Sequence, residues 1–103
     1  MITVDLYRNE QGLITRYQVS GHAGYAEAGQ DIICSAVSAL TQAPVMGLER
    51  YLKLKPSYTF NEDDGILKVA LNSAPDDLTQ AILETMLCGL DSIARQCPQY
   101  VRI

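Results

Sequence analysis

The most constraining feature of this sequence is an apolar stretch with helical spacing that runs from Ile32 to about Lys53. Its first half is apolar over more than half of the helix circumference, at Ile32, Ile33, Ala36, Val37, Ala39, Leu40 and Ala43. A helix with so wide an apolar surface must be buried on most sides. The fold must therefore place a sheet together with a second helix or a partner subunit around this segment.

Pro44 interrupts this stretch. A proline inside a helix removes one hydrogen bond and clashes with the carbonyl four residues back, at a cost of roughly 3 kcal/mol. The apolar rhythm nevertheless continues after it, at Val45, Met46, Leu48, Tyr51 and Leu52. We expect one helix, kinked at Pro44 and running to about Lys53, with a break at Pro44 as the alternative.

Two hairpins are predicted, one on each side of this helix. Residues 2–7 alternate apolar and polar side chains, the turn 9–12 follows, and a second strand places Leu13, Thr15, Tyr17 and Val19 on one face. Residues 57–61 and 66–71, joined by Asp63-Asp64-Gly65, predict the second hairpin.

A second helix is predicted after Ser73-Ala74-Pro75-Asp76, with Ser73 as its cap and Pro75 in its first turn. Its apolar stripe reaches Gln96, Pro98 stops it, and residues 100–103 can add a short last strand; the stripe is Leu78, Ile82, Met86, Leu87, Leu90, Ile93 and Ala94. The order ββαββαβ predicts a single α+β domain over residues 1–103. We expect a sandwich in which two helices cover an antiparallel sheet of about five strands, with the first helix between the sheet and the second helix or a partner subunit.

Composition narrows the classes of function. A net charge of −4 gives no electrostatic footprint for nucleic acid, and an acidic surface would sooner attract a basic polypeptide. No apolar run approaches the roughly 20 residues that cross a bilayer, and the N-terminus lacks the pattern of a signal peptide, so we expect no membrane and a cytoplasmic location. The three cysteines follow no disulfide framework, and one histidine cannot supply a usual zinc set, so we expect thiols, no metal and no cofactor.

Chemistry is concentrated in residues 21–38, where His22 lies twelve residues ahead of Cys34. Cys34 falls in the first turn of the predicted helix, where unpaired backbone N–H groups and the helix dipole favour a thiolate and could hold an oxyanion. Histidine is the side chain best suited to take the thiol proton. The residues alone leave two other readings open: Cys34 as a small apolar residue of a helix end, and His22 as a solvated loop residue.

Four neighbouring residues could support such a site. Asp31 could orient the imidazole, although the role of N-cap to the helix suits it better. Ser38, one turn beyond Cys34, could hydrogen-bond near the sulfur or only bond the backbone. Gly21 and Gly29 give the loop the freedom that a substrate-covering segment would use. Cys88 and Cys97, on the second helix and at its end, look structural.

The run from Gly21 to Ser38 resembles the signature of the ribosomal-processing cysteine proteases. In that family a Gly-His-Ala loop is followed by Gly-x-Asp-Ile-x-Cys-[Ala/Ser]-Ala-x-Ser. Gly21-His22-Ala23 match the first part, and the second is matched by Gly29, Asp31, Ile32, Cys34, Ser35, Ala36 and Ser38. The chain length, the element order and the stretch Gly47-Leu48-Glu49 extend the resemblance to nearly the whole chain, whereas Pro44 departs from the typical helix.

The resemblance implies that His22 and Cys34 are a catalytic dyad in a bacterial homodimer. It further implies that the substrate is the precursor of large-subunit ribosomal protein twenty-seven, whose short N-terminal extension is removed for ribosome assembly. An apolar groove beside Cys34 is then expected. Two other functions stay open: a ribosome-associated binding module that does not cut, and a thiol redox sensor. Only the protease requires both residues.

Overall fold

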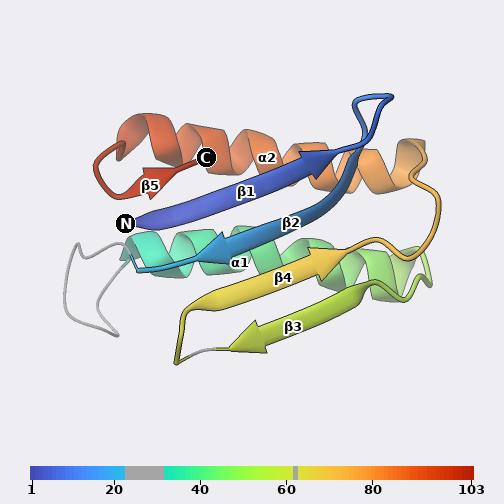
Figure 1. Ribbon diagram of the computed structural model, residues 1–103, viewed down its shortest axis with the longest axis horizontal. Coiled ribbons are helices and arrows are strands. Elements are labelled where there is room, and N and C mark those ends of the chain that lie inside the picture. Colours follow the sequence, from blue (N-terminus) through green and yellow to red (C-terminus); the bar gives the residue numbers. More distant parts are fainter. Residues whose placement is uncertain (23–31, 62) are drawn as a thin grey trace.

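The computed structural model describes residues 1–22, 32–61 and 63–103, and these form the predicted α+β fold (Figure 1). Two helices and five strands follow the order ββαββαβ, as expected. Their bounds are β1 Ile2–Arg8, β2 Ile14–Ser20, α1 Ile32–Met46, the π-helical segment η1 Gly47–Tyr51, β3 Ser57–Asn61, β4 Ile66–Ala70, α2 Asp77–Gln96 and β5 Val101–Arg102.

The five strands form one sheet in the order β3-β4-β2-β1-β5. The pairs β1–β2, β2–β4 and β3–β4 are antiparallel, whereas the short β5 runs parallel to β1, so the sheet is mixed. The parallel pair follows from the connection: α2 carries the chain from the end of β4 back along the sheet to its other edge. β3 is an edge strand, and all five of its residues are exposed.

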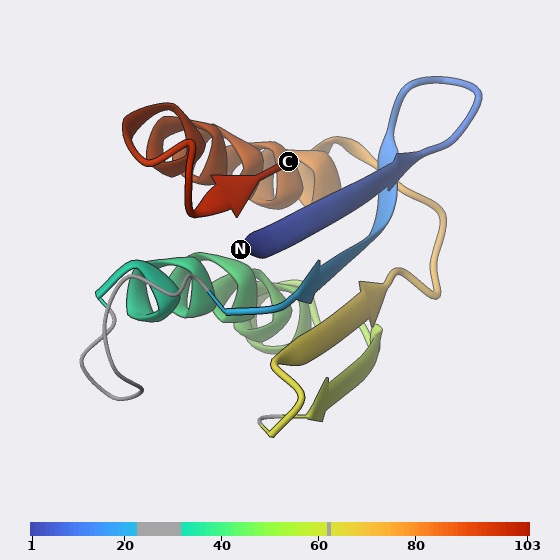
Figure 2. The ribbon, with the colours of Figure 1, turned by 60° about the vertical axis from the view of Figure 1, so that its left-hand side comes forward.

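Both helices lie side by side on one face of the sheet (Figure 2). The expectation that α1 is enclosed between the sheet and α2 is therefore wrong. Gly89 of α2 explains the lateral packing, because a Cβ atom there would lie 2.9 Å from Cδ2 of Leu40 on α1. As a result, parts of α1 that face away from the sheet stay exposed, including Ile32 and Met46.

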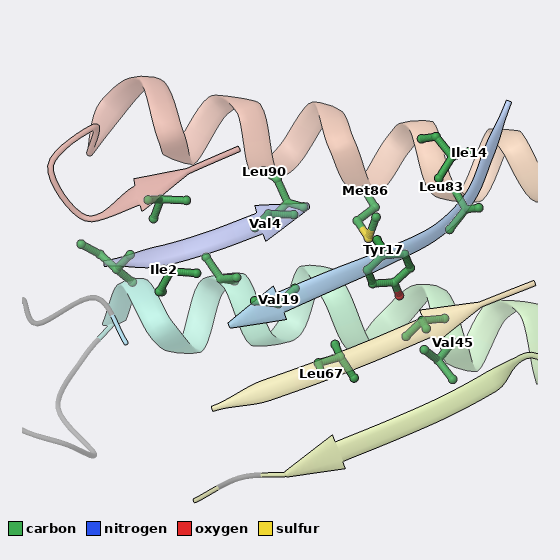
Figure 3. Close-up of a cluster of buried hydrophobic side chains, with 14 residues drawn as sticks. Ile2, Val4, Ile14, Tyr17, Val19, Val45, Leu67, Leu83, Met86 and Leu90 are labelled. Atoms are coloured by element: carbon green, nitrogen blue, oxygen red, sulfur yellow. The ribbon is translucent and has the colours of Figure 1, made fainter. Parts of the chain in front are cut away.

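The core lies between the sheet and this helical layer (Figure 3). Both helices and four of the strands contribute buried side chains to one cluster, among them Val4, Tyr17, Val19, Val37, Leu67, Leu83, Met86, Leu90 and Val101. The phenol of Tyr17 on β2 donates a hydrogen bond of 2.6 Å to the backbone carbonyl of Thr41, which fixes α1 on the sheet.

The inward face of β2 differs from the sequence prediction. A β-bulge shifts the register, because Tyr7 pairs with Arg16 whereas the next residue, Arg8, pairs with Ile14. One step along β1 thus corresponds to two residues of β2. This extra residue reverses which side chains of β2 point toward the core. Ile14 is consequently fully buried, while Thr15 and Leu13 are only partly buried.

Pro44 does not break the first helix. The helical run continues through the buried Pro44 and widens into η1 three residues later, with the Leu52 amide bonded to the Gly47 carbonyl. Proline lacks an N–H group, so the helix loses a hydrogen bond near this point, and a π-helical turn accommodates such an irregularity. The helix ends at Tyr51, slightly earlier than predicted.

The start of α2 also differs from the prediction. Asp76, not Ser73, is the N-cap: its carboxylate accepts from the Thr79 amide at 2.8 Å, and the Thr79 hydroxyl accepts from the Asp76 amide at 2.9 Å. Pro75 therefore precedes the helix. The buried stripe is Thr79, Leu83, Met86 and Leu90, and Leu78 is exposed.

The combined run Ile32–Tyr51 is long and apolar enough to span a membrane by length and composition. This corrects the sequence-based statement that no segment approaches that length. Within the fold Ile33, Val37 and Val45 of this run are buried in the core cluster, and a third of the run is buried in all.

Candidate active site

A cleft of about 400 Å³ lies beside the first half of α1. The α1 wall consists of Cys34, Val37, Ser38, Thr41 and Gln42. The rest of the wall comes from the sheet and its connections, at Ile2, Val19, Gly21, His22, Phe60, Gly65 and Leu67. The chain segments after β2, at the start of α1 and in the β3–β4 turn therefore meet around one space.

Cys34 is the third residue of α1 and is half-buried at the cleft. This confirms its predicted place in the first turn of the helix. The positive end of the helix dipole favours a thiolate at this position. Cys34, Cys88 and Cys97 are all thiols and not disulfides.

His22 follows β2 after a single intervening residue and lines the same cleft. Its side chain is exposed, while its backbone is held by the amino group of Met1, which donates to the His22 carbonyl. Gly21 lies against the same strand end: a Cβ atom there would fall 2.3 Å from the Met1 carbonyl oxygen. The main chain at His22 is thus fixed beside the start of β1.

The other predicted site residues divide into three groups. Ser38 and Gly21 line the cleft with the two candidate catalytic residues. Gly29 and Asp31 lie outside the described residues, so the cap or orienting role of Asp31 stays a prediction. Cys88 is exposed on α2, and Cys97 is the C-cap of that helix, partly buried against the core; neither lines the cleft.

The lining residues that the sequence did not predict for the site include Gln42, Phe60 and Gly65. Gln42 continues the ridge of Cys34 and Ser38 at intervals of four residues, a spacing that the helical pattern already contained. Phe60 is the only phenylalanine, and its pairing with Leu67 puts both side chains on the helix-facing side of the sheet. That pairing register could not be known before the hairpin was placed.

The lining of the cleft is mixed: apolar side chains such as Val37 and Leu67 alternate with the polar side chains of Thr41 and Gln42. Of the lining residues in the described part of the chain, only His22 and Cys34 are ionisable. Within residues 1–22, 32–61 and 63–103, no group of three or more histidine, cysteine or acidic residues could hold a metal ion. A thiol and an imidazole in one cleft are suited to proton transfer and attack on a carbonyl carbon.

Comparison with known families decides the wider assignment. The family model "Cysteine protease Prp" matches residues 1–102. The chain belongs to the Prp cysteine protease family. The ribosomal processing cysteine protease Prp of Staphylococcus aureus is 30% identical over 103 residues, covering 100% of this chain and 97% of that protein. Prp of Bacillus subtilis is 26% identical over 107 residues, covering 100% and 96%.

Solved structures of Prp share the fold. Prp from S. aureus with a covalently linked product peptide superposes with a TM-score of 0.93 at 30% identity, covering 99% of this chain and 96% of that one. The same protease with a substrate peptide gives a TM-score of 0.88 at 29% identity, with the same coverage. The predicted family and the one-domain α+β fold are thereby confirmed.

Proposed function

We propose that this chain is an endopeptidase that removes a short N-terminal extension from a large-subunit ribosomal protein, with Cys34 as nucleophile and His22 as general base. The observation that carries the proposal is that the one histidine of the chain and Cys34 line the same cleft. Any histidine-dependent chemistry in this protein must use His22.

In the proposed reaction His22 takes the proton of the Cys34 thiol, and the sulfur attacks the scissile carbonyl carbon. The tetrahedral intermediate collapses to a thioester as the C–N bond breaks, and the imidazolium gives its proton to the leaving amine. Water then hydrolyses the thioester, with His22 again accepting and returning a proton. The positive end of the α1 dipole would stabilise the negative charge of the oxyanion.

The substrate part of the proposal rests on the relatives. Their names describe ribosomal processing, and one solved relative carries a substrate peptide. The net charge of −4 also suits a basic polypeptide. We propose the precursor of large-subunit ribosomal protein twenty-seven as the substrate, and the cytoplasm as the compartment, where the three cysteines would stay reduced.

A homodimer is part of the same proposal. An apolar groove of about 410 Å³ runs between α1 and α2, lined by Leu40, Ala43, Pro44, Gly47, Ala81, Ile82, Thr85 and Met86. A second copy covering this groove would bury apolar surface that one sheet does not cover.

The test is incubation of the purified chain with the ribosomal protein precursor of its host, read by product mass. A new fragment that lacks a defined N-terminal segment supports the protease. An intact precursor that co-purifies with the chain would favour the alternative, a binding module that grips the ribosomal protein without cutting it.

A further inference from the structure

The β3–β4 turn makes an unusually close approach to His22. A Cβ atom at Gly65 would lie 3.0 Å from both Cε1 and Nε2 of the imidazole, and 3.0 Å from the Gly21 carbonyl oxygen. Side-chain carbons rarely come this close to other heavy atoms. A side chain at position 65 would therefore require the His22 ring and the Gly21 carbonyl to shift by a few tenths of an ångström.

The turn itself is anchored on both sides of this contact. The Asn61 side chain donates to the Asp64 carboxylate at 2.8 Å and accepts from the Asp64 amide at 3.2 Å. The ladder between β3 and β4 closes with the pair Asn61 and Ile66, directly beside Gly65. Gly65 has a φ of +63°, in the left-handed region. The exposed imidazole, not the turn, is therefore the part that would move if the two were pushed apart.

We propose that Gly65 is a positioning residue for His22: its bare Cα lets the imidazole rest against the β3–β4 turn, inside the cleft that Cys34 lines. This inference rests on the proposed dyad. A side chain at position 65 would displace the ring toward solvent and lengthen its path to the sulfur. A displacement of about 1 Å at a reacting group can cost about a hundredfold in rate, so the shift of a few tenths of an ångström that this contact requires should cost less.

The chain supplies a matched control at Gly12. This residue also has a left-handed φ, of +82°, but a Cβ atom there would meet nothing within 4 Å. Gly65→Ala and Gly12→Ala therefore impose a similar backbone strain, and only the former also pushes on the His22 ring and on the Gly21 carbonyl beside it. Gly65→Asn is a second variant, because asparagine tolerates the left-handed region better than alanine and still brings the Cβ atom.

The pH dependence of Cys34 alkylation by iodoacetamide reports the pairing of the two groups. Because the imidazolium favours the thiolate, the wild-type midpoint should lie below the value of about 8.5 for an ordinary cysteine. Other charges beside the contact are Asp63 and Asp64 in the turn and the Met1 amino group, and all of the variants keep them. Since the chain has one histidine, the Cε1 proton of His22 also gives a single assignable NMR resonance.

We expect Gly65→Ala and Gly65→Asn to raise the alkylation midpoint by at least about half a pH unit toward that of His22→Ala, and to shift the Cε1 proton resonance. The value of kcat should fall about tenfold or more with KM within about twofold, whereas Gly12→Ala should change neither. If His22→Ala changes midpoint and rate but both Gly65 variants match Gly12→Ala, the positioning role is overturned and the dyad stands. If His22→Ala changes neither, the dyad is overturned, and the role of Gly65 with it.

Discussion

The Tyr17 phenol donates its buried hydrogen bond to the Thr41 carbonyl across the interface between β2 and α1. Thr41 lies two helical turns beyond Cys34 and lines the same cleft, so this bond ties the nucleophile-bearing helix to the sheet near the site. The Thr41 hydroxyl is satisfied separately, by the Val37 carbonyl at 2.8 Å. Tyr17 therefore links the core to the helix that carries Cys34 through one buried hydrogen bond.

Tyr17→Phe should destabilise the fold by about 1 kcal/mol, because it removes one buried hydrogen bond while keeping the ring. Burial, with a smaller effect of Tyr58, raises the pKa of Tyr17. A raised pKa in the folded state means that the stability is present below the unfolded value of about 10 and is lost as the pH rises above it. Urea unfolding at pH 7 and above pH 10 measures both effects. A wild-type alkaline loss that persists unchanged in Tyr17→Phe would contradict the assignment.

The order in which the three cysteines are alkylated distinguishes a chemically activated thiol from one that is only exposed. Cys88 is exposed, whereas Cys34 and Cys97 are half-buried, so accessibility alone predicts that Cys88 is alkylated first. We expect Cys34 to react fastest with iodoacetamide near pH 7, because the helix start and His22 favour its thiolate. Peptide mapping after partial modification gives the order, and the assay is repeated with substrate peptide bound. Modification of Cys88 or Cys97 first would count against an activated Cys34.

The aromatic wall of the cleft should contribute to substrate binding. Phe60 lines the cleft and is 46% exposed, whereas Tyr58, two residues earlier on β3, is 44% exposed and lies outside the cleft lining. Phe60→Ala should lower kcat/KM for the precursor peptide at least about tenfold, mainly through KM, because burying an aromatic side chain against substrate contributes about 1.5–3 kcal/mol. Tyr58→Ala is the matched control. An equal loss in both variants would mean that the effect is not specific to the cleft.

The proposed homodimer can be tested at the groove between the helices. Sedimentation at tens of micromolar should give twice the chain mass of 11.3 kDa. Ile82→Glu should shift the protein to monomer, because a charge would be buried in the apolar groove. Leu78 lies one turn earlier on α2, is 59% exposed and does not line the groove. Leu78→Glu should therefore leave the dimer intact. A wild-type monomer would contradict the proposal.

Hydrophobic periodicity predicted the helices and strands because the pattern of each element is contained in that element's own residues. The alternation in β1, the helical spacing of α1 and the turn Asp63-Asp64-Gly65 are local properties, and the structure has all three. The N-cap of α2 also depends on neighbouring residues alone, but the sequence there offers more than one residue that could cap the helix. Ser73 and Asp76 both open plausible helix starts, and the reciprocal bonds between Asp76 and Thr79 decide between them.

What sequence reasoning missed depends on contacts between distant residues. The bulge that buries Ile14 exists only in the pairing of β1 with β2, and the lateral packing of the helices depends on Gly89 meeting Leu40. The site shows the same division. Residue type and spacing made His22 and Cys34 candidates, and the family resemblance named them as the dyad, which stays a prediction. Phe60 and Gly65, in contrast, enter the cleft because the second hairpin folds beside α1.

The central claim is that Cys34 and His22 act together on a peptide bond. The most direct measurement is the rate of precursor cleavage, read by mass, for Cys34→Ala and His22→Ala beside Cys88→Ala as a control. Each of the first two should lose at least about a thousandfold while still binding the precursor peptide, and their double variant should lose no more, since the pair acts as a unit. Cys88→Ala should cleave normally. Cleavage by Cys34→Ala at a rate near that of the wild type would contradict the account.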